Sequence, residues 1–495
     1  MPGLRNLKCI RDTAKEGGWT GHDALEEQPL SPMARLFHEP GSNVYIISML
    51  GSTTKIYPDV VKANLEHTLL MHPRFSSLQV VDKENGGEMK WVPVKVNLDN
   101  HVIVPELNPN MGPPDKIVED YISNLSKTTI PKSRPLWDLH LLNIKTSDAE
   151  ALGVFRIHHS IGDGMSLMSL LLACCVKASN PQALPTIPVM KSSTSNNSRG
   201  FWSVIQLVWN TIVGVLMFVA TALFLKDTKT PLKGSRGVEN NPRRFIHRTV
   251  GLEDVKLIKN AMNITINDVV VGVTQAALSR YLNRKYGEIR KEKGATEKKN
   301  YLPNNIRLRA TFFINIRPSV GIHALFDMMK KGTKVRWGNK IGYVLLPFTI
   351  ALRDDPLDYV REAKSVIDQK KASFESVCTY IITKLIIKFF GIKAAGVLNY
   401  KVFSNTTLWF SNVPGPQEEI AFCGHSMAYV APSCFGQPNA LMIHVVSYID
   451  KLTFMISADE GTIPDPQQLC DDLEHSLNLI KSAVLAKDRS VLHQE

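Results

Sequence analysis

The sequence has few cysteines, and none of them form a C-x-x-C pair. The seven cysteines are also odd in number, which argues against a disulfide framework and against a structural zinc site. Residues 1–18 carry charged side chains at short intervals and lack the continuous apolar region of a secretory signal. We therefore expect a reducing, cytosol-facing environment, and any membrane targeting would come from an internal segment.

Two kinds of functional motif are missing as well. No G-x-S-x-G sequence is present, so we do not expect a serine nucleophile on a strand-to-helix turn. The sequence also contains no zinc finger, no RNP motif and no basic stripe interleaved with aromatic residues. We therefore expect neither a bound metal ion nor a nucleic-acid partner.

The charge of the chain is strongly uneven. With 495 residues, of which 44% are hydrophobic, the chain is long enough for two domains. Its net charge of +12 lies wholly in residues 201–495, because residues 1–200 carry 20 basic and 20 acidic side chains. A basic second part predicts an anionic partner.

One segment, residues 201–225, contains no charged residue and no histidine and is long enough to cross a bilayer as a helix. Three interpretations remain open: a spanning helix, an interfacial helix and a buried core helix. Small and polar residues recur along it at helical spacing, which indicates that one side contacts protein or water; these are Ser203, Gln206, Asn210, Gly214 and Thr221. Basic residues are more frequent after the segment than before it, which predicts a cytoplasmic C-terminal side.

Hydrophobic periodicity predicts a mixed α/β chain of three parts: a first domain over 1–180, a linker over 181–244 that contains the apolar helix, and a second domain over 245–495. In the first domain we expect strands at 43–50, 137–144 and 151–159 and helices at 57–72, 113–125 and 164–178. In the second we expect helices at 265–282, 357–371, 376–390 and 466–485, and strands at 311–318, 407–411, 441–449 and 452–458.

The sharpest motif is His158-His159-Ser160-Ile161-Gly162-Asp163-Gly164, which lies between an apolar strand and an apolar helix. Adjacent strand residues point to opposite faces, so His158 and His159 are badly placed to bind one metal ion together. A single histidine on a rigid strand end suits a general base that removes a proton from a hydroxyl or an amine. The alternative is a pair of histidines that are simply hydrogen-bonded in the core.

This heptapeptide resembles the HHxxxDG signature of the CoA-dependent acyltransferase superfamily. Further segments occur in the same order as in the wax ester synthase/diacylglycerol acyltransferase family, and the chain resembles its plant members most. These segments are PLWDLHLL (135–142), IND (266–268), INIRP (314–318), GNKIG (338–342) and SNVPGP (411–416). The resemblance implies two similar chloramphenicol-acetyltransferase-like α/β domains with a tunnel between them.

The resemblance also implies an activity, namely transfer of a long-chain acyl group from acyl-CoA to a fatty alcohol, to diacylglycerol, or to both. Acyl-CoA is then a co-substrate, with no permanently bound cofactor. His159 is the implied general base, with His158, Asp163 and Gly164 beside it in the motif, and Arg317 is the implied salt-bridge partner of Asp163.

Three asparagine and glycine residues complete the implied site. Asn267 is a candidate donor to the oxyanion, although on the residues alone it equally fits a cap for a helix that starts at Asp268. Asn412 and Gly415 are expected beside the site, while the sequence around Gly415 by itself indicates only a rigid turn.

Alternatives to this function remain open. The same fold could be a catalytically silent lipid-binding or membrane-scaffold protein, or it could acylate a small polar acceptor. Because an active site between two domains needs both on one side of a membrane, we expect 201–225 to dip into the cytosolic leaflet of the endoplasmic reticulum, with the plasma membrane as a second location. The segment 380–396 carries interspersed lysines and fits either a membrane-surface helix or an ordinary amphipathic core helix.

Overall fold

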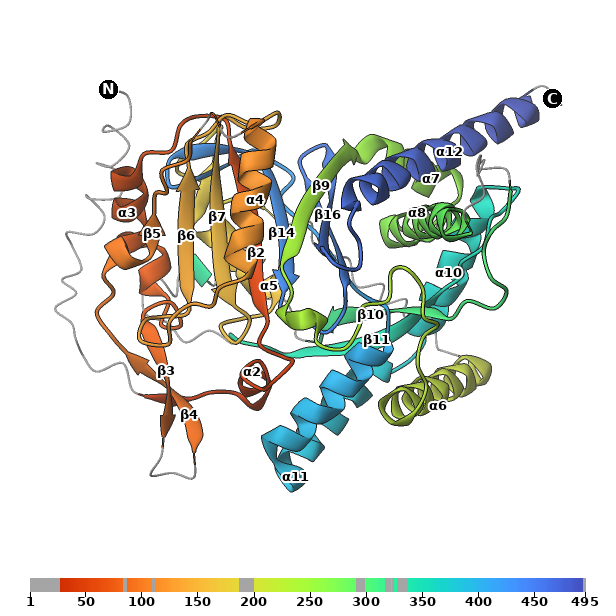
Figure 1. The fold of residues 1–495 in the computed structure, drawn as a ribbon, viewed down its shortest axis with the longest axis horizontal. Coiled ribbons are helices and arrows are strands. Elements are labelled where there is room, and N and C mark those ends of the chain that lie inside the picture. The colour runs from red at the N-terminus through yellow and green to blue at the C-terminus, as the bar shows by residue number, and fades with distance from the viewer. Residues whose placement is uncertain are drawn as a thin grey trace.

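A computed structural model describes residues 27–82, 87–108, 110, 112–186, 200–290, 299–316, 322, 325, 326 and 337–492, the side chains only as far as 487. In these ranges two large sheets stand side by side, each with its own helices (Figure 1). The first has seven strands in the order β5-β6-β7-β2-β14-β13-β8, and the second has six in the order β11-β10-β12-β15-β16-β9. A small sheet, β1-β4-β3, projects from the first half.

The seven-stranded sheet is built around β7 (Ala151–His158), which is buried along its whole length. Burial on both faces fits its predominantly apolar sequence. It pairs with β2 (Tyr45–Ser52) on one side and β6 (Trp137–Leu142) on the other. The remaining strands of the sheet are β5 (Val102–Ile103), β8 (Cys175–Lys177), β13 (Ile420–Phe422) and β14 (His425–Phe435). The helices of this half are α2 (Pro32–Leu36), α3 (Pro58–His67), α4 (Pro114–Ser126) and α5 (Gly164–Ala173), and the small sheet contains β1 (Gln28–Pro29), β3 (Ser77–Asp82) and β4 (Glu88–Pro93).

The six-stranded sheet contains β9 (Arg243–Gly251), β10 (Leu308–Asn315), β11 (Ile341–Phe348), β12 (Leu408–Val413), β15 (Leu441–Tyr448) and β16 (Lys451–Asp459). Its helices are α6 (Phe201–Leu223), α7 (Leu252–Ala261), α8 (Ile266–Ile289), α10 (Leu357–Lys371), α11 (Glu375–Asn405) and α12 (Pro466–Leu492). Helix α8 is buried over most of its circumference, and side chains of α7, α8, α10 and α12 form one core with the sheet.

The second half of the chain contributes strands to the first sheet. Strand β14, which comes from the second half of the chain, pairs antiparallel with β2 from Met427 opposite Ser52 to Phe435 opposite Tyr45. Nothing in the local pattern indicates this pairing, so residues 420–435 are an exception to the predicted assignment of 245–495 to a second unit.

Two predicted helices end at other residues than expected. The helix predicted over 164–178 ends at Ala173, because Cys175–Lys177 forms an edge strand with β13, and the helix predicted over 376–390 continues to Asn405.

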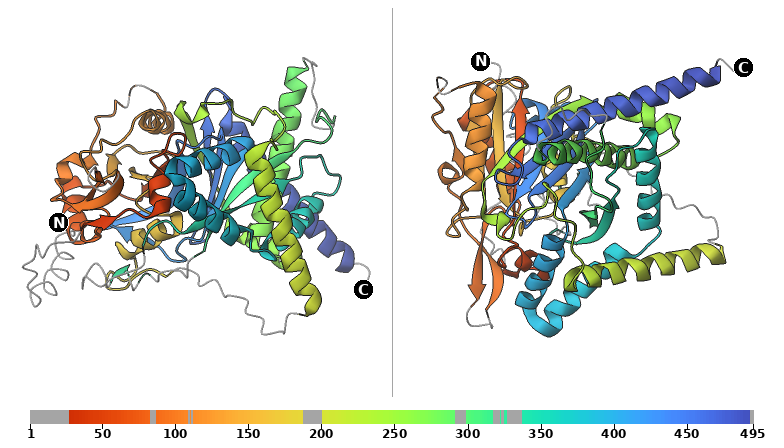
Figure 2. Two further views of the ribbon diagram at one scale, coloured as in Figure 1. Left: turned by 90° about the horizontal axis from the view of Figure 1, so that it is seen from below. Right: turned by 45° about the vertical axis from the view of Figure 1, so that its right-hand side comes forward.

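Helix α6 lies on the surface of the second half, as two further views show (Figure 2). Among the described residues it is the one helix that is long and apolar enough to cross a membrane. Its polar stripe meets protein: Asn210 Nδ2 donates to the carbonyl oxygens of Gln369 and Ala372, and Gly214 lies directly against the carboxylate of Glu375. Ser203 and Gln206, at the start of the stripe, are exposed. The buried-core interpretation is therefore wrong, because most of the helix surface is open to solvent.

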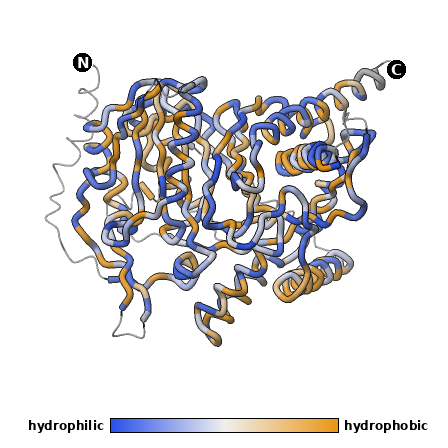
Figure 3. The backbone as a smooth tube through the Cα atoms, viewed as in Figure 1, coloured by the Kyte–Doolittle hydropathy of each residue, from blue (hydrophilic) through white to orange (hydrophobic). Residues whose placement is uncertain are grey.

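Helix α11 packs beside α6 and carries a second apolar surface. It bends at Gly391, whose φ of +82° lies in the left-handed region that glycine tolerates. Just before the bend, Phe389 and Phe390 are 67% and 74% exposed. Apolar residues therefore mark both α6 and α11 on the same side of the molecule (Figure 3).

Candidate active site

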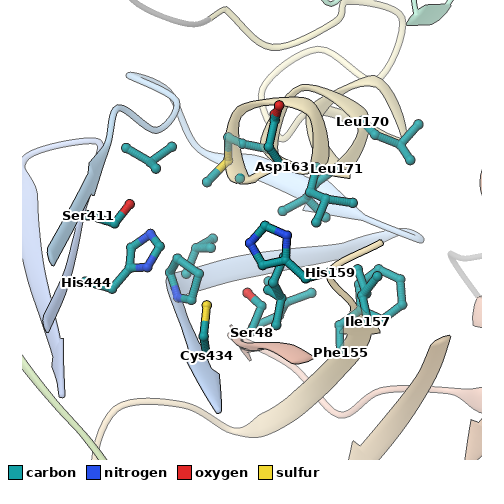
Figure 4. Close-up of a pocket in the computed structure, with 18 of the residues that line it drawn as sticks. Ser48, Phe155, Ile157, His159, Asp163, Leu170, Leu171, Ser411, Cys434 and His444 are labelled. Atoms are coloured by element: carbon teal, nitrogen blue, oxygen red, sulfur yellow. The ribbon is translucent and has the colours of Figure 1, made fainter. Parts of the chain in front are cut away.

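The principal apolar cavity lies where the two sheets meet, and it has a volume of about 120 Å³. Residues of the first sheet and of α5 form one part of its wall, and residues of β10, β12 and β15 form the other (Figure 4). The lining is almost entirely aliphatic and aromatic; its polar members are Ser48, His159, Asp163, Ser411 and His444. Such a cavity suits an apolar chain with a few polar groups that fix its reactive end.

His159 follows directly after β7 and lines this cavity. Its main-chain N–H donates to the carbonyl of Val44 at 2.9 Å, and the ring of Phe37 stacks on its imidazole with centroids 4.1 Å apart. Nδ1 is buried and has no hydrogen-bond partner among the described residues. Burial lowers the pKa of His159 to about 4, and Asp163 and Asn339 offset only part of this effect. The imidazole is therefore neutral at physiological pH and able to accept a proton.

His158 points away from the cavity into a buried polar network. Its Nδ1 is 2.6 Å from Ser160 Oγ, and its Nε2 is 3.0 Å from Asn43 Oδ1. Ser160 Oγ donates to Gln79 Oε1, which is also bonded to His38. Of the two histidines only His159 lines the cavity, and the hydrogen bonds of His158 hold the strand end. The placement of His158 with the catalytic residues stays a prediction.

Asp163 and Gly164 begin helix α5, and both line the cavity. Asp163 caps the helix, because its Oδ1 accepts from the main-chain N–H of Ser166 at 2.9 Å. Its Oδ2 accepts from the main-chain N–H of Lys340 at 3.3 Å, which ties the motif to the segment before β11. Arg317, the partner that the resemblance implies, lies outside the described residues.

Asn339, in GNKIG, is a residue to which the sequence assigned no role. It is buried, and its Nδ2 donates to the carbonyl of His159 at 2.9 Å, and at 3.4 Å to that of Ser160. A side chain from the second half of the chain therefore hydrogen-bonds to the main chain of the HHSIGDG motif in the first half. The local sequence around Asn339 gives no sign of this contact.

Asn267 and Asn412 lie together but away from the cavity wall. Asn412 Nδ2 donates to Asn267 Oδ1 at 2.6 Å, and both residues are half-buried. Helix α8 begins at Ile266 with Thr265 as its cap, in a capping box with Asp268, so the interpretation of Asn267 as the cap is wrong. Asn267 does not line the cavity, so the structure does not place it beside a substrate. A role as an oxyanion donor stays a prediction.

Gly415 follows β12 at a close approach of two chain segments. A Cβ at this position would lie 2.0 Å from the carbonyl oxygen of Ser447, and the Gly415 N–H donates to Ser447 Oγ at 3.2 Å. A glycine is required here for steric reasons. Its contribution to the site is therefore to let β12 and β15 continue side by side.

His444 is the functional candidate that the sequence did not reveal. It lies in the middle of β15, is 7% exposed, and lines the cavity with His159. A lone histidine within the apolar run LMIHVVSYI looks like an ordinary core residue, so only the three-dimensional placement identifies it. No group of three or more potential metal ligands gathers within the ranges that the structure describes.

Comparisons with known proteins agree with this arrangement. Residues 48–270 match the model of the wax ester synthase/diacylglycerol acyltransferase catalytic domain, and residues 337–481 match that of the WS/DGAT C-terminal domain. Wax ester synthase/diacylglycerol acyltransferase 11 of Arabidopsis thaliana is 49% identical over 94% of this chain and 97% of its own length. Number 5 of the same series, also from Arabidopsis thaliana, is 50% identical over 93% and 94%.

Two solved structures share the fold. The wax ester synthase/diacylglycerol acyltransferase from Marinobacter aquaeolei VT8 superposes with a TM-score of 0.58 at 17% identity, over 92% of this chain and 99% of that one. The first condensation domain of the calcium-dependent antibiotic synthetase superposes with a TM-score of 0.56 at 12% identity, over 93% and 97%. The predicted fold class is thereby confirmed, and the chain belongs to the wax ester synthase/diacylglycerol acyltransferase family.

Proposed function

We propose that this chain transfers a long-chain acyl group from acyl-CoA to the hydroxyl of a fatty alcohol or diacylglycerol, with His159 as the general base. The observation that carries the proposal is a neutral imidazole in the wall of an apolar cavity between the two sheets. Family membership supplies the reaction class. The cavity supplies the surroundings in which an acyl chain and a single hydroxyl meet without water.

The chemistry needs only the two substrates and one proton carrier. An imidazole nitrogen of His159 accepts the proton of the hydroxyl while the hydroxyl oxygen attacks the thioester carbon. The tetrahedral intermediate then collapses, the carbon–sulfur bond breaks, and the proton passes from His159 to the leaving thiolate of CoA. The ester and free CoA are the products, and His159 returns to its neutral form.

The lining of the cavity favours long apolar acceptors over small polar ones. A small polar acceptor would leave its remaining hydroxyl or amine groups against aliphatic and aromatic side chains, which is unfavourable. The silent scaffold alternative gives no reason for a buried imidazole in the cavity wall whose Nδ1 has no hydrogen-bond partner among the described residues. The excess of basic residues in 201–495 supports binding of the CoA phosphates and of anionic lipid headgroups.

The acceptors are membrane lipids, and we propose that α6 and α11 hold the protein on the cytosolic face of the endoplasmic reticulum or the plasma membrane. A single crossing by α6 is incompatible with the sheet, because β2 precedes α6, β14 follows it, and the two strands are hydrogen-bonded to each other. The exposed apolar side of α6 with a protein-facing polar stripe fits an interfacial helix.

The test is ester formation by membranes that contain the wild-type protein or His159→Ala, supplied with labelled palmitoyl-CoA and either hexadecanol or diacylglycerol. Loss of the base should lower the rate by about a hundredfold or more. His425→Gln is the matched control, because His425 is a buried histidine of β14 that does not line this cavity. Equal rates for His159→Ala and wild type would reject His159 as the base, and no ester from the folded wild-type protein would reject the function.

A further inference from the structure

Strand alternation places His444 on the face of β15 that lines the cavity. Its neighbours Ile443 and Val445 pack into the core between the second sheet and its helices. Met442 and His444 alternate with them and line the cavity, and Figure 4 shows the His444 imidazole in the cavity wall. The imidazole therefore stands in the wall that the second sheet provides, whereas His159 stands in the wall that the first sheet provides.

The polar groups of His444 are unused within the protein. Neither Nδ1 nor Nε2 has a hydrogen-bond partner among the residues that the structure describes, although the side chain is 93% buried. Buried polar groups are nearly always paired, and an unpaired one is costly. A leucine or phenylalanine would fill the same place without that cost. The natural partner of His444 is therefore a polar group that enters the cavity.

The charge state of His444 limits what that partner can be. Burial, together with the nearby His159, lowers the pKa of His444 to about 4. A neutral imidazole offers one N–H donor and one lone pair. A thioester presents one strong acceptor to such a donor, its carbonyl oxygen, which becomes negatively charged when the carbon is attacked.

We propose that His444 donates an imidazole N–H hydrogen bond to the thioester carbonyl oxygen of acyl-CoA and stabilises the oxyanion during acyl transfer. The inference rests on the proposed function. The base must reach the hydroxyl hydrogen while the donor must reach the carbonyl oxygen, and two walls of one cavity place the two imidazoles on different sides of the reacting carbon.

The step balances without a further reactant. As the hydroxyl oxygen forms its bond to carbon, the π pair of the carbonyl moves onto oxygen, where the His444 N–H meets it. When the carbonyl re-forms, the carbon–sulfur bond breaks and His159 protonates the thiolate. His444 keeps its own proton throughout, which distinguishes its role from that of a second base.

Two other side chains compete for this role. Asn267 has an amide N–H to donate, but it does not line the cavity. Ser411 lines the cavity and lies opposite His444 in the pairing of β12 with β15, so its hydroxyl is the nearest alternative donor on this wall. Ser411→Ala therefore belongs in the same experiment.

The experiment measures kcat and KM for palmitoyl-CoA and hexadecanol in membranes that contain wild type, His444→Phe, His444→Gln, Ser411→Ala or His425→Gln. Phenylalanine fills the space but cannot donate, and glutamine restores an N–H. We expect His444→Phe to lower kcat by about 10²–10³-fold, the usual loss on removing one oxyanion donor, with little change in KM. His444→Gln should recover at least part of that loss, and His425→Gln should match wild type.

Three results would overturn the inference while leaving the proposed function standing: unchanged kcat in His444→Phe, a higher KM at unchanged kcat, or a larger kcat loss in Ser411→Ala than in His444→Phe. Equal losses in the phenylalanine and glutamine variants, accompanied by a lower melting temperature, would assign His444 a structural role. Absence of ester from wild type would instead remove the proposed function, and this inference with it.

Discussion

Asn412 Nδ2 donates a hydrogen bond to Asn267 Oδ1 at 2.6 Å, and this bond joins the end of β12 to the first turn of α8. It connects SNVPGP with IND, two segments that are 145 residues apart in the chain. Both were expected near the substrate, and the structure shows that they are at least neighbours of each other.

A double-mutant cycle should reveal this pairing. Asn267→Ala and Asn412→Ala should each lower the free energy of unfolding by about 1 kcal/mol, the usual net value of one hydrogen bond. The double variant should be hardly less stable than either single one, because the second substitution removes nothing further. Denaturant unfolding measures all three, and strictly additive losses would show that each side chain acts elsewhere.

Removing the Asn339 side chain should impair the reaction more than the fold. Asn339→Ala deletes the donor to the carbonyl of His159 and leaves that main-chain group free to shift the base. We expect a fall in kcat of about tenfold or more, since small misplacements of a catalytic group are expensive. Steady-state kinetics measure it, with Asn300→Ala in an exposed loop as the control. A changed KM at constant kcat would contradict a role in placing His159.

The pH dependence should reflect the apolar surroundings of His159. Because burial lowers its pKa to about 4, the base stays neutral well below the usual histidine range. We expect kcat/KM to stay level as the pH falls to about 5 and to decrease only below that, whereas an ordinary histidine would lose half of its base form near 6.5. Initial rates at constant ionic strength test this, and a midpoint near 6.5 would contradict it.

The folded state should begin to lose stability at a higher pH than the pH at which His159 becomes protonated. Burial also lowers the pKa of His72 and His101, to about 3 and about 4. As the pH falls below 6.5 the unfolded chain takes up these protons first, so their contribution to stability is complete above 6.5 and declines down to about 4 for His101 and about 3 for His72. Each histidine contributes up to about 1.4 kcal/mol per pH unit. Melting curves across this range measure the decline, and rates must be read where the protein is still folded.

Polar substitutions on the open side of α6 should release the protein from membranes. Trp202, Trp209 and Leu216 are 78%, 64% and 61% exposed, so Trp202→Gln, Trp209→Gln and Leu216→Gln together should cost little stability. Flotation with liposomes of neutral and anionic lipid should show the variant in the soluble fraction. The matched control replaces Val80 and Val81, exposed apolar residues of β3, and should float like wild type. Unchanged flotation of the α6 variant would remove this helix as the anchor.

Gly415→Ala should destabilise the protein without changing the chemistry of the site. The added methyl group would meet the carbonyl oxygen of Ser447 at 2.0 Å, so β12 or β15 would have to move. Overpacking of this kind costs about 1–3 kcal/mol. Differential scanning fluorimetry measures it, with Gly200→Ala, where no atom lies within 4 Å and φ is −56°, as the unobstructed comparison. An unchanged melting temperature for Gly415→Ala would mean that the two strands separate easily.

The elements that could be predicted from sequence are those whose pattern is local. Strands β7 and β15 are predominantly apolar, and α10 shows clear helical periodicity, so their positions were correct to within a few residues. Strands β9, β11 and β14 were missed. The first is rich in arginine, and the other two contain Pro347 and Pro432, residues that are usually kept out of strand interiors.

The site divides in the same way. His159 could be predicted because motif and strand end coincide in a few residues. Asn339 and His444 come to lie beside His159 or its cavity only through the packing of distant segments, and neither residue type in its local setting differs from a structural one. The pairing of β14 from the second half with β2 from the first brings these segments together, and such long-range pairing leaves no periodic signal.

The late position of β14 in the chain also sets an order of events during synthesis. Helix α6 is complete at Leu223, whereas β14 ends at Phe435, so the ribosome delivers the apolar helix long before the first sheet can close around its missing strand. Domains otherwise tend to fold from the N-terminus as they emerge. With α6 as the proposed membrane helix, a nascent chain of this kind would meet the bilayer half-assembled. A helix that settles in one leaflet keeps both parts of the unfinished sheet in the same compartment until translation ends.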